Sequence, residues 1–110
     1  MYKINITKAA EIDLQNAAFY IANNLKNKTA ANRLLDAVEK ELSSLCDMPE
    51  RNPLVRDSFL ASNGVRMQMI KNYLAFYVVR NENCSVTVLR ILHSRRDWIT
   101  ILTNEIVENY

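Results

Sequence analysis

The sequence predicts a single α+β domain over residues 1–110, with a helical N-terminal half and a sheet in the C-terminal half. Apolar residues recur at helical spacing as far as residue 45, and from residue 65 they alternate as in strands. One glycine and two prolines indicate regular elements with short connections. Apolar residues make up 49% of the 110-residue chain, which is enough for one core and excludes a disordered protein.

The N-terminal half predicts a strand and a helical hairpin. Residues 2–6 alternate as in a short strand, and Thr7 can cap the helix that follows. The apolar positions of this helix are Leu14, Ala18, Ile21 and Leu25. A polar break at 23–28 leads to a second helix, which begins near Thr29 and which Pro49 ends. Its apolar stripe is Ala31, Leu34, Leu35, Val38, Leu42 and Leu45.

The C-terminal half predicts three strands, at about residues 65–70, 73–80 and 85–92. A connector at 49–64 precedes them, with one helical turn near residues 58–61, and a tail of helical character follows at 98–110. A two-residue turn at 71–72 sets the register of the first two strands. It pairs Ile70 with Tyr73, Gln68 with Ala75, and Arg66 with Tyr77.

This register divides the strands into two faces. One is apolar and is expected to pack on the helical hairpin: Val65, Met67, Met69, Leu74, Phe76 and Val78. The other is expected to be an open outer face: Arg66, Gln68, Ile70, Tyr73, Ala75 and Tyr77. A loop at 81–84 places Val78 opposite Thr87 and Ala75 opposite Arg90. Arg90 then joins the outer face, and its charge stays out of the core.

Positive charge is concentrated between residues 51 and 96, although the formal net charge is only +2. The basic residues there are Arg51, Arg56, Arg66, Lys71, Arg80, Arg90, Arg95 and Arg96, and the acids are only Asp57 and Glu82. Such a half favours an acidic partner, whether nucleic acid or protein. The alternative interpretation is that these basic residues form a solvated edge of the protein.

The outer face and its basic rim form the predicted target-binding surface. Its members are Arg66, Gln68, Lys71, Tyr73, Tyr77, Arg90, His93, Arg95 and Arg96. Guanidinium groups, phenols and an imidazole on a sheet suit phosphates and stacked bases. Alternatively, the tyrosines cover the sheet and the arginines stack on them.

Three residues at the end of the last strand have structural interpretations. For His93, the only histidine, we favour a hydrogen-bonded structural role over acid–base chemistry. Asp97 is expected to cap the helix that begins at Trp98, or to pair with Arg95 or Arg96. Trp98 is expected to plug the edge of the core.

The cysteines and the hydropathy bound the other classes of function. Cys46 and Cys84 lie far apart and have no metal-ligand spacing, so no metal or cofactor is predicted. The chain shows neither a leader pattern nor a long apolar run. We therefore expect a cytoplasmic protein with reduced thiols and no membrane association.

Short motifs run in order along nearly the whole chain. They are ITKAAEIDL at 6–14, FYI at 19–21, AA at 30–31, LCDMP at 45–49, GVR at 64–66, YLAFY at 73–77 and VLRILHSRRD at 88–97. Their order and spacing resemble the RelE/ParE superfamily, the toxins of bacterial toxin–antitoxin pairs. The resemblance implies a helical hairpin packed on an antiparallel sheet, a short C-terminal helix, and an acidic, partly disordered antitoxin as partner.

The superfamily has two branches with different targets. RelE-like members cut mRNA on the ribosome without a metal or cofactor, and ParE-like members inhibit DNA gyrase. If this chain is a nuclease, the resemblance implies as catalytic candidates Arg66, Tyr77, Arg90, His93 and Arg95.

This chain departs from the RelE pattern at two places. Leu74 follows Tyr73 where the RelE pattern has an arginine, and only Trp98 or Tyr110 could stand for the catalytic tyrosine near the C-terminus. The ending LHSRRD resembles the ParE branch. Gyrase is therefore the leading target, ribosome-bound mRNA is the alternative, and an inactive member that only binds its antitoxin is a third possibility.

Overall fold

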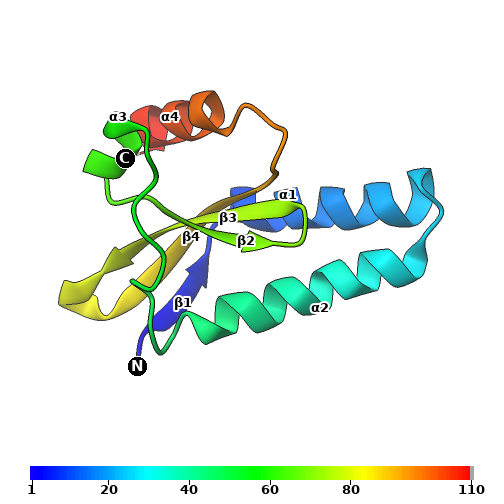
Figure 1. Ribbon diagram of the computed structural model, residues 1–110, viewed down its shortest axis with the longest axis horizontal. Helices are drawn as coiled ribbons and strands as arrows, with labels where there is room; N and C mark the ends of the chain where they lie inside the picture. The colour runs from blue at the N-terminus through cyan, green and yellow to red at the C-terminus, as the bar shows by residue number, and fades with distance from the viewer. Residues whose placement is uncertain (110) are drawn as a thin grey trace.

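The computed structural model describes residues 1–109 as a helical hairpin, a four-stranded sheet and a C-terminal helix (Figure 1). The elements are β1 (Lys3–Ile6), α1 (Lys8–Phe19), the π-helical turn η1 (Tyr20–Asn24), α2 (Lys28–Ser44), α3 (Ser58–Ser62), β2 (Arg66–Ile70), β3 (Tyr73–Arg80), the 3₁₀ turn η2 (Asn81–Asn83), β4 (Ser85–His93) and α4 (Trp98–Asn109). The predicted α+β class is confirmed. Tyr110 lies outside the described residues.

Side-chain caps fix where the two helices of the hairpin begin. Thr7 Oγ1 accepts a hydrogen bond from the Ala10 amide at 3.1 Å, as expected, and Asn27 Oδ1 accepts one from Ala30 at 2.9 Å. η1 prolongs α1, and the Leu25 amide donates to the Tyr20 carbonyl. The α1–α2 connection projects past the end of the sheet (Figure 1). α2 ends at Ser44 rather than at Pro49, because tight turns follow it.

The sheet has the strand order β1-β4-β3-β2 and is mixed. β1 runs parallel to β4, and the other neighbours are antiparallel. The predicted β2–β3 register is confirmed, with Arg66 opposite Tyr77 and Ile70 opposite Tyr73. β1 pairs only with residues 85–88, so within residues 1–109 no strand lies beside the second half of β4 on that side.

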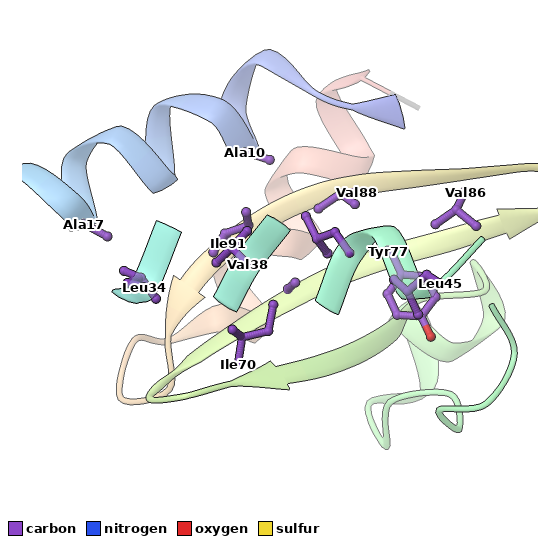
Figure 2. Close-up of a cluster of buried hydrophobic side chains, with 12 residues drawn as sticks. Ala10, Ala17, Leu34, Val38, Leu45, Ile70, Tyr77, Val86, Val88 and Ile91 are labelled. Atoms are coloured by element: carbon purple, nitrogen blue, oxygen red, sulfur yellow. The ribbon is translucent and has the colours of Figure 1, made fainter. Parts of the chain in front are cut away.

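The predicted assignment of the two sheet faces is wrong. The hairpin packs on the face that carries Ile70, Ala75 and Tyr77, together with Val86, Val88 and Ile91 from β4 (Figure 2). The face predicted to meet the hairpin instead packs on α3 and α4; its core includes Val65, Leu74, Phe76, Val78, Leu89, Leu102 and Ile106. Both faces of the sheet are therefore covered. For this reason every residue from 74 to 78 is buried, whichever face its side chain points to.

The predicted β3–β4 register is right at Val78, which faces Thr87, and wrong at Arg90. A β-bulge beside Phe76 and Tyr77 shifts the pairing by one residue, so Arg90 faces Phe76, and Ile91 faces Ala75. Arg90 consequently lies between α1 and α4 rather than on an outer face.

Candidate functional site

The predicted outer surface is divided by the connector, which covers one end of it. Tyr77 is fully buried; its hydroxyl donates to the Pro49 carbonyl at 2.7 Å and accepts from Asn52 Nδ2 at 3.1 Å. Gln68 Oε1 accepts from Asn52 Nδ2 and from Arg51 Nη2, each at 2.9 Å. These contacts place Tyr77 and Gln68 beneath or against the connector and not on an open face.

Arg66 is held by the same connector. Its Nη1 donates to the Asn52 carbonyl, and its Nη2 lies 3.6 Å from Glu50 Oε2. The side chain of Arg66 is 18% exposed. The structure therefore uses the guanidinium of Arg66 to fasten residues 50–52 to β2.

Arg90 forms an ion-paired clasp that joins three elements. Its Nε and Nη2 donate to the two carboxylate oxygens of Asp13 on α1 at 2.7 and 2.8 Å, and its Nη1 donates to Glu105 on α4 at 3.2 Å. The hydrogen bond to Asp13 is the main cause that raises the pKa of Arg90. Asp13 also accepts a hydrogen bond from the Ile91 amide at 3.0 Å. This bond satisfies a backbone amide in the part of β4 that β1 does not pair with.

Four of the predicted surface residues remain together at the other end of the sheet. Tyr73 and His93 face each other across β3 and β4, with ring centroids 5.2 Å apart and a T-shaped arrangement. Lys71, in the β2–β3 turn, and Arg96, after β4, are both exposed. We call Lys71, Tyr73, His93 and Arg96, together with Tyr20 of η1, the sheet-end site.

Backbone hydrogen bonds hold the loop that carries Arg96. The Ser94 amide donates to the Asn72 carbonyl at 2.9 Å, and the Arg96 amide donates to the His93 carbonyl at 3.0 Å. His93 Nδ1 accepts the Arg95 amide at 3.1 Å. The hydrogen-bonded structural role expected of His93 is therefore present, and its ring still lines the site.

Two adjoining pockets meet at the sheet-end site and share Tyr20, Tyr73 and His93. The first, of about 270 Å³, lies between the hairpin tip and the β2–β3 turn and has an apolar wall that includes Ile21 and Leu34. The second, of about 200 Å³, is more polar and is lined by Asn16 and Arg96, among others.

The sheet-end site carries positive charge and hydrogen-bond donors. Burial, and secondarily the neighbouring Tyr20, raise the pKa of Tyr73, so its phenol stays a neutral hydrogen-bond donor. Asp13 lines the second pocket, but Arg90 neutralises its charge. Lys71 and Arg96 therefore leave the site attractive to an anion.

Sequence reasoning missed Tyr20 and Asp13 as site residues, although a signal for both was present. Asp13 lies three residues after Ala10, and Tyr20, the first residue of η1, lies three after Ala17, so both fall on the side of the first helix that meets the sheet. A carboxylate on a buried face requires a cationic partner. The sequence could thus have linked Asp13 to an arginine on a strand.

Asp97 and Trp98 have the structural roles that the sequence predicts. Asp97 caps α4, with Oδ1 accepting the Thr100 amide at 3.3 Å and Oδ2 accepting the Thr100 hydroxyl at 2.8 Å. At the start of α4, the centroid of the Trp98 ring lies 5.1 Å from that of Phe76, at the edge of the core. Neither residue lines the sheet-end site.

Within residues 1–109, no group of three or more histidine, cysteine, aspartate or glutamate side chains is placed to hold a metal ion. No helix in the same part of the chain is long and apolar enough to cross a bilayer.

Three solved structures that share this fold are toxins or parts of toxin–antitoxin systems. A chain of the RelBE toxin–antitoxin complex from Mycobacterium tuberculosis is 22% identical, with a TM-score of 0.63 over 84% of this chain and 96% of that one. A chain of the chromosomal ParDE system from P. aeruginosa is 16% identical, with a TM-score of 0.69 over 84% and 96%. A doubly substituted E. coli RelE toxin in the free state is 12% identical, with a TM-score of 0.65 over 99% and 98%. At these identities the likeness concerns the fold.

The family follows from the sequence comparison. The family described as the ParE toxin of the type II toxin–antitoxin system parDE matches residues 4–98. The chain therefore belongs to the ParE toxin family, within the RelE/ParE superfamily. No curated protein matches the sequence.

Proposed function

We propose that this toxin arrests growth by inhibiting DNA gyrase in the cytoplasm, and that a cognate antitoxin neutralises it. The observation that carries the choice of gyrase is how two of the three predicted nuclease arginines are used, while Arg95 is exposed. Arg66 is bound to Asn52 and Glu50, and Arg90 is bound to Asp13 and Glu105. Neither guanidinium is free to meet a scissile phosphate.

The position where the RelE pattern has an arginine supports the same choice. Leu74 is 4% exposed and packs in the core beneath α4. Metal-independent RNA cleavage needs a general base, a general acid and charge stabilisation of the phosphate. Loss of one such donor costs about 100- to 1000-fold in rate.

Two apolar grooves suit an antitoxin segment that folds as it binds. One lies beside β1 and includes Ile6 and Leu14; the other lies beside β2 and includes Leu54 and Trp98. Leu35 and Met69, both predicted to be buried, line these grooves and are 37% and 63% exposed. β1 and β2 are also the edge strands of the sheet, to which an extended segment can add. The RelBE and ParDE relatives come from toxin–antitoxin systems.

A short induction of the wild-type chain tests the target. We expect DNA breaks and filamentation with bulk transcripts intact, because a gyrase inhibitor damages DNA before it alters mRNA. Mapping of transcript 5′ ends is the matched readout. Cuts in phase with codons that appear within minutes, and that are lost in Arg66→Ala, would overturn gyrase and make Arg66 the phosphate-binding residue.

Ribosome-dependent mRNA cleavage is the second candidate, and one observation favours it. The sheet-end site places an imidazole, two phenols and two cations around adjoining pockets, which is a possible acid–base set. If codon-phased cuts survive in Arg66→Ala but are lost in Arg96→Ala and His93→Gln, the nuclease centre is the sheet-end site.

Co-expression with a candidate antitoxin, a small acidic protein encoded next to this chain, tests the partner. We expect growth to be rescued, and the purified pair to protect residues of the two grooves from hydrogen exchange. A chain that is harmless when expressed alone in its native host contradicts the toxin proposal. It would favour an inactive member that only binds its antitoxin.

A further inference from the structure

The two adjoining pockets of the sheet-end site have the form of a small-molecule site. Their volumes are about 270 and 200 Å³, and together they reach the lower part of the range of roughly 300–1,000 Å³ usual for ligand pockets. The first is mainly apolar and the second is more polar. A ligand that fills both must have an apolar part joined to a polar part.

The walls of the first pocket suit a planar ligand. The rings of Tyr20, Tyr73 and His93 line it, and aliphatic side chains of η1 and α2, including Ile21 and Leu34, complete the wall. Aromatic rings bind nucleobases by stacking, whichever base is present. The Asn72 amide at the rim can pair with the polar edge of a base.

The second pocket suits an anion. Arg96 lines it, and the Tyr20 and Tyr73 phenols that it shares with the first pocket can donate hydrogen bonds. Among the described residues that line the second pocket, the carboxylate is that of Asp13, which already accepts two hydrogen bonds from Arg90 and one from the Ile91 amide. Lys71, which lines the first pocket, adds a second positive charge to the site.

We propose that the sheet-end site binds a nucleotide, with the base in the apolar pocket and the phosphate against Arg96 in the polar pocket. The chemistry is the same for a free nucleotide and for one nucleotide of a single strand. Nucleotide binding here does not depend on whether gyrase or mRNA is the target, so the proposed function can fail while this site stands.

Two unique residues make the test direct. His93 is the only histidine and lies in the site, whereas Trp98 is the only tryptophan and packs on the core at the start of α4, outside the site. The full-length chain is titrated with adenosine 5′-monophosphate, a short single-stranded oligodeoxynucleotide, inorganic phosphate and an oligoglutamate peptide. We expect the ring resonances of His93 to shift with a nucleotide probe and the indole N–H of Trp98 to stay in place.

Single substitutions assign the two halves of the site. Arg96→Gln and Lys71→Gln should each raise the Kd about tenfold, because each removes a charge-assisted contact. Tyr20→Leu should raise the Kd by a similar factor, about tenfold, through lost stacking. Arg80→Gln, at the far end of β3, removes an exposed charge away from the site and should leave the Kd unchanged. The Trp98 resonance reports that each variant is folded.

The probes decide the outcome. Saturation by adenosine monophosphate supports a free nucleotide, and saturation by the oligonucleotide alone supports a strand. If inorganic phosphate shifts the His93 resonances as strongly as adenosine monophosphate does, the base contributes nothing to binding and the proposal is overturned. Oligoglutamate that shifts His93 where no nucleotide does indicates an acidic protein segment and also overturns it, as does the absence of any shift.

Discussion

The two ends of the sheet on its hairpin side carry similar side chains and use them differently. At one end, Arg66 and Tyr77 are fastened to the connector and leave little surface for a ligand. At the other end, Tyr73 and Arg96 line pockets open to solvent. The difference shows that an arginine or tyrosine on a strand has a structural role where another segment of the chain covers it. The same residue type is available to a ligand where it lines an open pocket.

The clasp at Arg90 should show the largest effect on stability. Asp13→Asn removes the charge that faces Arg90, and we expect it to lower the free energy of unfolding by about 2–4 kcal/mol, because it breaks a largely buried ion pair and leaves Arg90 only the longer contact with Glu105. Urea unfolding measures this. Asp36→Asn, an exposed carboxylate on α2, is the matched control.

A double-mutant cycle of Asp13→Asn with Arg90→Met sharpens that result. We expect a coupling energy of more than about 1 kcal/mol, since the two side chains are in direct contact. Additive losses would place the cost of Asp13→Asn in its bond to the Ile91 amide instead.

The closed end should show the next largest effect. Tyr77→Phe deletes a buried hydroxyl and leaves the Pro49 carbonyl without its donor, so we expect a loss of about 1–2 kcal/mol in the free energy of unfolding with toxicity retained. Tyr2→Phe deletes a hydroxyl whose bond to Asn81 is exposed and should cost less than about 0.5 kcal/mol. Equal losses in the two variants would show that the connector does not lock Tyr77.

The open end should tolerate substitution. Replacement of Arg95 and Arg96 together by alanine should change the free energy of unfolding by less than about 0.5 kcal/mol, because both are exposed, and should weaken toxicity. Thermal unfolding and a growth assay measure the two effects, with Arg80→Ala as the exposed control. A large loss of stability would make this end structural too, and the comparison between the ends would fail.

The smallest expected effect is on the pH dependence of stability. Burial raises the pKa of Tyr73, so the folded state keeps this proton at a pH where the unfolded chain, with a pKa of about 10, loses it. The contribution is complete below pH about 10 and declines as the pH rises through the folded pKa. The free energy of unfolding of the Tyr73→Phe variant, measured by urea unfolding at a series of pH values, should therefore decline less steeply above pH about 10 than that of the wild type. Parallel curves would place the Tyr73 phenol in solvent.

The sequence alone determined the elements, the β2–β3 register and the family resemblance. These depend on short-range patterns: the alternation of strands, the spacing of the α2 stripe, and caps such as Thr7 and Asp97. Each is set by residues within a few positions of one another.

Only the tertiary structure decided which surface is open. The sheet is covered on one face by the hairpin and on the other by α3 and α4, and α4 packs on the face that the sequence assigned to the hairpin. A one-residue bulge then turned Arg90 toward Asp13, 77 positions away in the chain. Register and coverage depend on long-range packing, where one residue of slip exchanges core for surface. For that reason the residue types predicted a cationic, aromatic surface, and only the fold brought Lys71, Tyr73, His93 and Arg96 together at one end of the sheet.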